Sequence, residues 1–202
     1  MNRGIIVSIQ GYSSNTNNEL CNSAIDAGAA AIRTDKPIKN RSIPVIGLIK
    51  VKTDRKEETP YITPDIDLIK RVAEWADYIA IDFRMINKNL DAVSNYCREN
   101  KLKIIADIRN IEDYFNIVEI GYYYDYVATT FSVFDKKFEP NITLVSSLHE
   151  AGCKRIIAEG NYSRYKDVKD AFRLGANNIC IGGAISDVYK LTRRYTTIDF
   201  NC

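Results

Sequence analysis

Short apolar segments recur along the whole chain, and each is followed by a longer segment in which apolar residues have helical spacing. Near-continuous apolar runs of about four to eight residues are typical of parallel strands that are buried on both faces. The pattern therefore predicts eight strands, at residues 4–10, 30–35, 44–50, 78–83, 103–108, 126–131, 155–160 and 178–183.

The segments between these strands have the features of crossover helices. In residues 63–76, apolar positions recur at intervals of three and four, and we expect Thr63 to cap a helix with Pro64 at its first position. Glycines are expected to end three other helices, at Gly121, Gly152 and Gly175. The connection at 36–43 is too short for a proper crossover helix and is predicted to hold only a helical turn.

Eight alternating strand–helix units in 202 residues favour a closed parallel barrel. We therefore predict an α/β fold, a (β/α)8 TIM barrel of the phosphate-binding type with a shortened second helix, in a single domain spanning residues 1–202. A doubly wound open sheet is the alternative, and it is less favoured because long strands at one edge would lie unpaired.

Composition limits the classes of partner. The chain is 46% hydrophobic and 27% charged, as in ordinary soluble domains, and its net charge of +2 gives no reason to expect nucleic acid or an anionic membrane as a partner. An apolar run near the ~18 residues of a membrane span is absent from the sequence, and so is a signal-peptide core. We expect a cytoplasmic protein.

The five cysteines do not form a metal or disulfide pattern. None has CxxC or Cys/His spacing, and an odd number argues against a complete disulfide framework. We expect reduced thiols, four of them in or near the core. The sequence has no metal-ligand constellation and no nucleotide fingerprint, so neither a metal nor a cofactor is expected.

Polar residues follow the apolar part of nearly every predicted strand. In a barrel the carboxyl ends of the strands converge on one mouth, where active sites of this fold lie. One such residue taken alone could simply be a strand end that meets solvent, but the recurrence predicts a site. The residues are Gln10, Arg33, Lys50, Asp82, Asp107, Thr130, Glu159, Gly182 and Gly183.

Two of these residues are candidates for acid–base chemistry. Lys50 follows the apolar run VIGLI, and a desolvated lysine can act as a general base or form a Schiff base. Glu159 closes the run IIAE, and a carboxylate at the end of a buried strand does acid–base work or pairs with a cation. The alternatives are a surface lysine that leads into a charged loop and a purely structural ion pair.

A glycine pair is the candidate phosphate site. Gly182 and Gly183 follow the eighth predicted strand and precede an expected helix start, where bare backbone N–H groups can hold an anion. Barrels of this type often bind phosphate at the loops after strands seven and eight. A tight turn without a ligand is the alternative interpretation.

Several strings together carry a family resemblance. They are GIIVSIQ, AIRTD, VIGLIK with PYITP, IIADI, VATTF, AGCKRIIAEG and IGGAIS, in this order, and the match runs from about residue 4 to residue 194. In these strings the chain resembles bacterial N-acetylmannosamine-6-phosphate 2-epimerases. The resemblance implies an isomerase that interconverts N-acetylmannosamine 6-phosphate and N-acetylglucosamine 6-phosphate in sialic acid breakdown, with a phosphorylated amino sugar as its small-molecule partner. A homodimer is one possibility, because barrels often bury exposed helix faces in this way.

The resemblance also implies roles for particular residues. Lys50 and Glu159 correspond to the family's catalytic pair. Positions that contact the sugar or tune the site correspond to Gln10, Arg33 and Asp107, and the backbone phosphate seat corresponds to Gly160, Gly182 and Gly183. In the ring-opened sugar, the C1 aldehyde acidifies the proton on C2, so one group can remove this proton and another return it on the opposite face.

The sequence departs from the family pattern at several positions. Asp187 stands where an arginine or another residue that suits a phosphate is usual, and Arg109 stands where a small hydroxyl residue is common. Lysines of the 50–56 loop and Arg84 are candidates for the missing positive charge. A Schiff-base aldolase, another phosphosugar isomerase and a non-catalytic phosphosugar-binding barrel are the competing functions.

Overall fold

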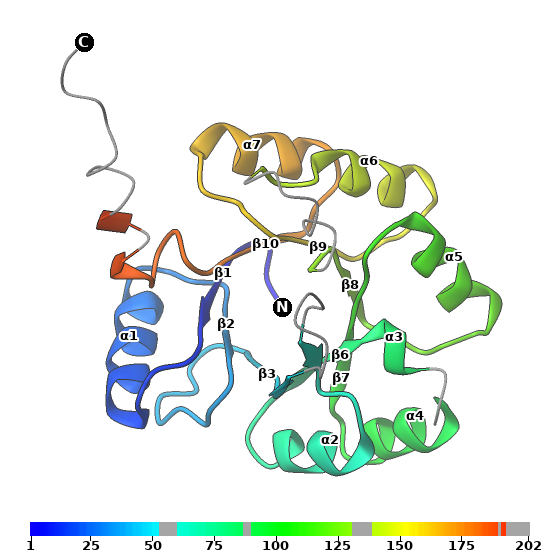
Figure 1. Cartoon of the computed structure of the whole chain (residues 1–202), viewed down its shortest axis with the longest axis horizontal. Coiled ribbons are helices and arrows are strands. Elements are labelled where there is room, and N and C mark those ends of the chain that lie inside the picture. The colour runs from blue at the N-terminus through cyan, green and yellow to red at the C-terminus, as the bar shows by residue number, and fades with distance from the viewer. Residues whose placement is uncertain (53–59, 87–89, 131–138, 190, 193–202) are drawn as a thin grey trace.

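The structure, a computed structural model, describes residues 1–52, 60–86, 90–130, 139–189 and 191–192. Eight parallel strands close into a barrel in the order β1-β10-β9-β8-β7-β6-β3-β2 (Figure 1). The predicted barrel and its eight strands are confirmed. The strands are β1 (Gly4–Ile9), β2 (Ala31–Thr34), β3 (Val45–Gly47), β6 (Tyr78–Asp82), β7 (Lys103–Asp107), β8 (Tyr126–Ala128), β9 (Ile156–Glu159) and β10 (Asn178–Ile181).

Helices surround the barrel (Figure 1). Gly121, Gly152 and Gly175 follow three of them with φ of 64°, 83° and 108°, a left-handed conformation that favours glycine, so the predicted helix ends are confirmed. The labelled helices are α1 (Ser14–Asp26), α2 (Ile66–Ala73), α3 (Phe83–Ile86), α4 (Leu90–Glu99), α5 (Ile111–Glu119), α6 (Ile142–Glu150) and α7 (Tyr165–Arg173).

Two local predictions were wrong. Residues 35–44 contain no helical turn at all, and the connection between β2 and β3 covers the barrel with the buried side chain of Ile38 instead. The cap of α2 is Asp65, whose carboxylate accepts a hydrogen bond from Leu68 N at 2.9 Å. Thr63 lies outside the helix, because its hydroxyl and its backbone are both bonded to Ile49.

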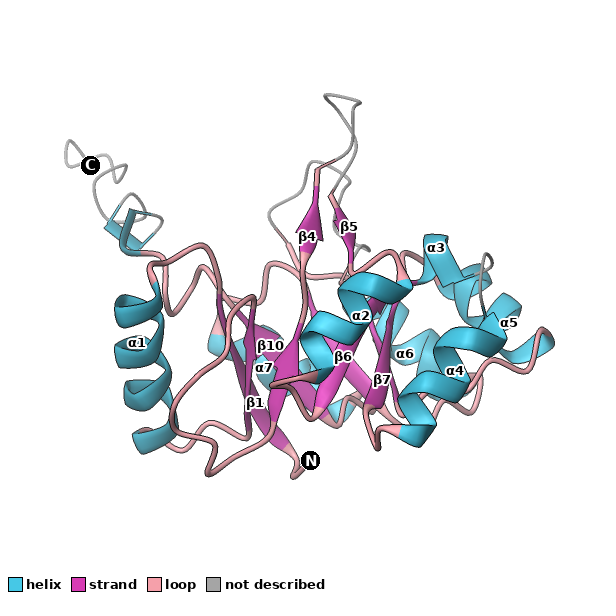
Figure 2. Cartoon of the chain, turned by 90° about the horizontal axis from the view of Figure 1, so that it is seen from below, coloured by secondary structure: helices cyan, strands magenta, loops and turns pink. Residues whose placement is uncertain are grey.

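The third predicted strand ends earlier than expected. β3 stops at Gly47, where α2 packs so closely that an added Cβ would lie 2.4 Å from Val72 Cγ1. The chain then forms a separate antiparallel hairpin from β4 (Lys50–Val51) and β5 (Tyr61–Ile62). Figure 2 shows this hairpin projecting from the end of the barrel opposite to the N-terminus. Lys50 therefore belongs to the hairpin and not to the barrel wall.

Apolar side chains fill two regions. One lies between the strands and the helices, and Ile104, Val127 and Ile179 belong to it. The other fills the barrel interior with residues that include Ile105 and Ile157. Cys21, Cys97, Cys153 and Cys180 are buried free thiols, as predicted, and Cys202 lies outside the described residues. Among the helices of the described part, none is long and apolar enough to cross a membrane.

Candidate active site

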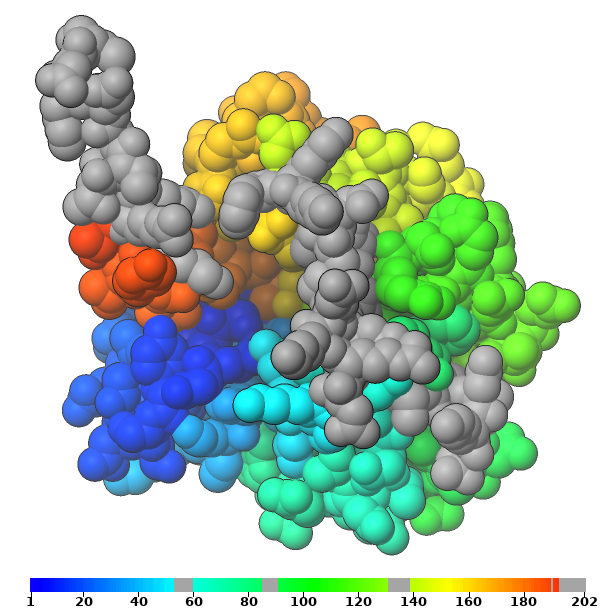
Figure 3. All heavy atoms as spheres, viewed as in Figure 1, coloured from blue at the N-terminus to red at the C-terminus, as the bar shows by residue number. Residues whose placement is uncertain are grey.

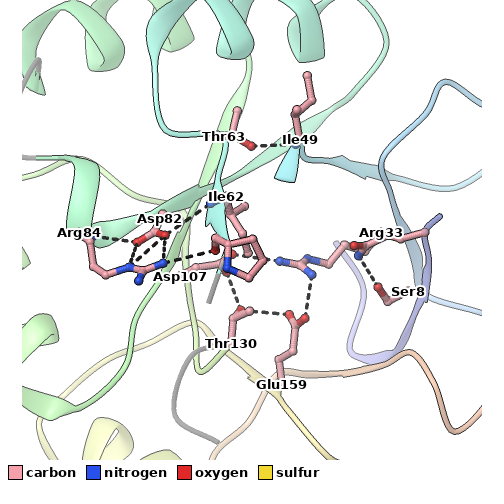
Figure 4. A network of polar contacts seen from close by, with 12 residues as sticks. Ser8, Arg33, Ile49, Ile62, Thr63, Asp82, Arg84, Asp107, Thr130 and Glu159 are labelled. Atoms are coloured by element: carbon pink, nitrogen blue, oxygen red, sulfur yellow. Dashed lines mark hydrogen bonds and ion pairs between the residues drawn. The ribbon is translucent and has the colours of Figure 1, made fainter. Parts of the chain in front are cut away.

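An arginine joins two carboxylates in the mouth of the barrel. Arg33, from β2, donates from Nη2 to Asp107 Oδ2 at 3.0 Å and from Nη1 to Glu159 Oε1 at 2.8 Å. The guanidinium thus reaches β7 in one direction and β9 in the other, as Figure 4 shows. The side chains of Arg33 and Asp107 are 5% and 0% exposed, and that of Glu159 is 13% exposed. Of the three, Glu159 is therefore the most accessible to a ligand.

Two threonines complete this network. Thr130 Oγ1 lies 2.7 Å from Asp107 Oδ1 and 3.2 Å from Glu159 Oε2, so it bridges the two carboxylates (Figure 4). Thr129 fixes the backbone of Glu159 in both directions, because its hydroxyl donates to Glu159 O and accepts from Glu159 N, both at 2.9 Å. The VATTF string indicated that these threonines lie at the end of β8, but nothing in the sequence indicated which carboxylates they would contact.

The buried charges shift one another's proton affinities. Burial alone would lower the pKa of Arg33, but Glu159 and Asp107 raise it, so Arg33 stays charged. Burial raises the pKa of Asp107 to about 7, and the negative charge of Glu159 acts in the same direction against the opposing effect of Arg33. Two carboxylates share one guanidinium here, so a second cation nearby is electrostatically favoured.

Lys50 supplies a positive charge above this network. Its side chain is partly open to solvent on β4, yet surrounding atoms of the mouth desolvate its amine and lower its pKa. The charge of Arg33 lowers it further, whereas Glu159, Asp35 and Asp107 act against the shift. The neutral amine that a general base requires is therefore more accessible at Lys50 than at an ordinary surface lysine.

The remaining predicted ligand positions gather on one side of the mouth, where β9, β10 and β1 are neighbours. Gln10 donates to Ser8 Oγ at 2.7 Å, and its Oε1 is buried without a protein partner among the described residues. A Cβ on Gly182 would lie 3.4 Å from Ser8 Cβ, in van der Waals contact, so Gly182 lies directly beside Ser8. Gly160 follows Glu159 directly with φ of 100°, a conformation that favours glycine.

The glycine pair forms a turn rather than a helix start. Ile185 N and Ser186 N both donate to Gly182 O, at 2.8 and 3.0 Å, and the helix that follows begins only at Val188. The prediction that a helix starts directly after the glycine pair was therefore wrong. The hydroxyl of Tyr12 donates to Ser186 O, which joins this turn to the segment after β1, and Figure 3 shows these N- and C-terminal segments side by side.

Arg84 does not supply charge to the glycine turn. It lies in α3, directly after β6, and three strands separate β6 from β10 in either direction around the barrel. Its guanidinium is paired with the fully buried carboxylate of Asp82, Nη2 to Oδ2 at 2.6 Å. Arg109 likewise pairs with Asp113, Nη2 to Oδ1 at 2.7 Å. Of the 50–56 loop, residues 53–56 lie outside the described part.

The described residues contain no group of three or more His, Cys, Asp or Glu side chains that could hold a metal ion. What the mouth does hold is a lysine of lowered pKa, a partly exposed carboxylate and a buried guanidinium between two anions. This arrangement suits the removal and return of a proton beside a polarised carbonyl group.

Comparisons with known proteins agree with this chemistry. Residues 18–199 match a protein family described as "Putative N-acetylmannosamine-6-phosphate epimerase". The chain is 34% identical over 175 residues to the "Putative N-acetylmannosamine-6-phosphate 2-epimerase" of Salmonella arizonae, which covers 81% of this chain and 74% of the relative. The protein of that name from Klebsiella pneumoniae is 31% identical over 189 residues, covering 86% and 77%.

A solved structure is similar over nearly the whole chain. The N-acetylmannosamine-6-phosphate 2-epimerase of Clostridium perfringens superposes with a TM-score of 0.83 and 26% sequence identity. The superposition covers 96% of this chain and 92% of the other.

Proposed function

Because the chain belongs to the N-acetylmannosamine-6-phosphate epimerase family, we propose that it interconverts N-acetylmannosamine 6-phosphate and N-acetylglucosamine 6-phosphate. The observation in the molecule that carries this proposal is the convergence of Lys50 and the Arg33–Glu159 pair on one mouth. The reaction inverts C2 of the ring-opened sugar, and it needs two groups of matched proton affinity on opposite faces of that carbon.

Lys50 and Glu159 are the proposed pair. The lowered pKa of Lys50 makes its neutral amine available to accept the C2 proton, and Glu159 is the more accessible of the two carboxylates that Arg33 binds. When one group removes the proton, an enediolate-like intermediate forms and negative charge develops on the C1 oxygen. The group on the other face then returns a proton to C2.

Arg33 is proposed to stabilise the charge that develops on the substrate oxygen. It is held rigidly because both of its terminal nitrogens are bonded to carboxylates, and a preorganised donor of this kind needs no rearrangement during the reaction. Asp107 is fully buried, which favours a tuning role over contact with the sugar. Its charge and that of Glu159 keep Arg33 protonated.

The opposite side of the mouth is proposed to hold the rest of the sugar phosphate. Gly160, Gly182 and Gly183 are the proposed phosphate seat, where a backbone without side chains allows close approach of an anion. Gln10 offers a buried, unbonded carbonyl oxygen among the described residues and is the proposed partner of a sugar hydroxyl or amide.

Proton NMR in deuterated buffer tests the proposed reaction. Incubation of the protein with N-acetylmannosamine 6-phosphate is expected to yield the gluco epimer with deuterium at C2, because the abstracted proton exchanges with solvent. A folded protein that produces neither the epimer nor deuterium exchange would contradict the proposal.

Lys50→Ala tests the assignment of the base. We expect at least a thousandfold loss of kcat with an unchanged circular dichroism spectrum, because the side chain is partly exposed and supports no core packing. A variant that keeps more than a small fraction of the activity would remove Lys50 from the mechanism.

A Schiff-base aldolase is the second candidate, because a lowered lysine pKa also favours attack on a carbonyl group. In that reaction the amine of Lys50 adds to the substrate carbonyl and water leaves, so borohydride would reduce the imine to a stable adduct at Lys50. Deuterium exchange at C2 without any adduct would exclude this candidate.

A cytoplasmic location and a homodimer are further parts of the proposal. Phe115 and Val118 of α5 expose 53% and 54% of their surface, which is a high fraction for apolar side chains. Light scattering after gel filtration measures the oligomeric state, and a monomer at micromolar concentration would contradict the dimer.

A further inference from the structure

The barrel wall does not hold Lys50 in place. β3 ends at Gly47, and Lys50 lies on a hairpin whose two strands, β4 and β5, have two residues each. A two-stranded ribbon is only marginally stable by itself. Other contacts must therefore fix the hairpin if the amine of Lys50 is to stay above Arg33 and Glu159.

Thr63 fixes the residue that precedes Lys50. Its backbone N donates to Ile49 O at 2.7 Å, and its Oγ1 accepts from Ile49 N at 3.1 Å (Figure 4). Thr63 is fully buried and has a φ of 45°, a conformation that a β-branched residue adopts only under strain. Strained backbone of this kind persists where the surroundings enforce it, commonly at functional sites.

Asp82 and Arg84 fix the other strand of the hairpin. Asp82 Oδ2 accepts from Ile62 N at 3.4 Å, and Ile62 is the residue paired with Lys50 across the hairpin. Arg84 binds the same carboxylate through Nε and Nη2, and its Cζ lies 4.6 Å from the centroid of the Tyr61 ring. Arg84 Nη2 also donates to Pro60 O at 3.3 Å.

These contacts connect Lys50 to the barrel rim by two routes that meet at the consecutive residues Ile62 and Thr63. In one, Thr63 is bonded to Ile49, and in the other, Asp82 at the end of β6 is bonded to Ile62 and to Arg84. We propose that Thr63, Asp82 and Arg84 form a latch that holds the β4–β5 hairpin on the rim and so positions Lys50 over the Arg33–Glu159 pair. The proposal rests on the proposed function in one respect only, that Lys50 moves the proton.

The latch acts on position and not through contact with the substrate. Lys50 is surrounded by the charges of Arg33, Glu159, Asp35 and Asp107, and its amine is partly desolvated. If the hairpin shifts, the amine moves away from these groups into water. Its pKa should then rise towards that of an ordinary lysine, and the fraction of neutral amine at neutral pH should fall.

The neighbouring strand offers a matched control. Arg109, after β7, binds Asp113 through Nε at 2.9 Å and Nη2 at 2.7 Å, the same fork that Arg84 makes with Asp82, but its partner belongs to α5 and not to the hairpin. For Arg84→Ala we expect kcat to fall about tenfold to a hundredfold with KM within about twofold of the parent. Arg109→Ala should leave both constants within about twofold.

A second pair of variants tests the Thr63 route. Thr63→Val keeps the shape and the β-branch but removes the oxygen that accepts from Ile49 N, so kcat should fall about tenfold at unchanged KM. Thr63→Ser restores the hydroxyl and should restore most of kcat. Equal activity of the valine and serine variants would overturn this part of the latch.

A measurement without substrate separates the latch from the proposed function. The rate at which acetic anhydride labels Lys50, followed against pH by mass spectrometry, gives the pKa of its amine. This pKa should rise in Arg84→Ala and stay at the parent value in Arg109→Ala. If Arg84→Ala does not fold, because Asp82 is left unpaired, Tyr61→Leu removes only the stacked ring and should raise the same pKa.

An unchanged Lys50 pKa and an unchanged kcat in the Arg84 and Tyr61 variants would overturn the latch. A parent protein without epimerase activity would overturn the proposed function instead, and the labelling result would still decide whether the latch positions Lys50.

Discussion

Two layers of the same barrel interior differ in character although the same strands build them. On β7, Ile105 and Asp107 face the same side, two residues apart, and both are buried. Four other strands repeat this step from an apolar or small residue to a polar one, in the pairs Ile6 and Ser8, Ala31 and Arg33, Ala80 and Asp82, and Ile157 and Glu159.

The apolar or small residues of these pairs form a lower layer, and the polar residues form an upper layer at the mouth. The lower layer stabilises the fold, whereas the upper layer contributes functional groups at a cost in stability. Burial of the apolar side chains in the lower layer stabilises the folded state. Met1 packs against this layer at the end of the barrel opposite to the mouth, and its amino group donates to the Tyr78 hydroxyl at 3.1 Å. Above, burial of Arg33, Asp107 and Glu159 requires desolvation of charges, which their mutual contacts only partly offset. Buried charge that does not improve stability is commonly retained for function.

Glu159→Gln, in the upper layer, should give the largest effect, a loss of activity without a loss of stability. The amide has nearly the same shape but cannot exchange a proton, so kcat should fall at least a thousandfold while the melting temperature stays close to that of the parent. Steady-state kinetics and thermal melting measure the two quantities. A variant with near-normal turnover would place Glu159 among structural ion pairs.

Asp107→Asn should change the pH dependence of stability. Burial raises the pKa of Asp107 from 3.8 to about 7. Between these pH values the folded state keeps a proton that the unfolded state has lost, so stability falls as pH rises, by up to about 1.4 kcal/mol per pH unit.

The asparagine variant lacks this titration and should show a flatter profile. Urea unfolding at several pH values between 4.5 and 7 compares the two slopes. Identical slopes in parent and variant would mean that Asp107 is ionised throughout the range.

Ile105→Val, in the lower layer, should give the smallest effect, a loss of stability without a loss of activity. Loss of one buried methyl group in the lower layer costs about 1 kcal/mol of unfolding free energy. The kcat of the folded protein should stay within about twofold, since the polar layer above keeps its contacts. A large loss of kcat at unchanged stability would show that the two layers are not separable.

The sequence predicted the barrel well because its signals are local. Buried parallel strands appear as apolar runs, and Gly121, Gly152 and Gly175 mark helix ends through a backbone preference of their own. The alignment of polar strand ends also indicated the mouth, because parallel strands in a barrel must bring these ends together. Among the candidates, the structure joined Arg33, Asp107 and Glu159 by direct contact.

Other features depended on partners distant in sequence. Lys50 continues the apolar run VIGLI, so the sequence predicted a single strand, but β3 ends at Gly47 and Lys50 pairs with Ile62 in a separate hairpin. Thr63 resembles a helix cap because Pro64 follows it, yet its hydroxyl is bonded to Ile49. Thr130 and Arg84 contact carboxylates that the sequence could not assign to them.

The sequence by itself determined the strand count, the barrel, the mouth and the residues eligible for acid–base chemistry, since periodicity and strand order are properties of neighbouring residues. Only the tertiary structure decided which charges pair, which of them stay accessible and what holds Lys50. Those outcomes depend on burial and on distances between atoms of different strands, and electrostatic free energies change steeply with both.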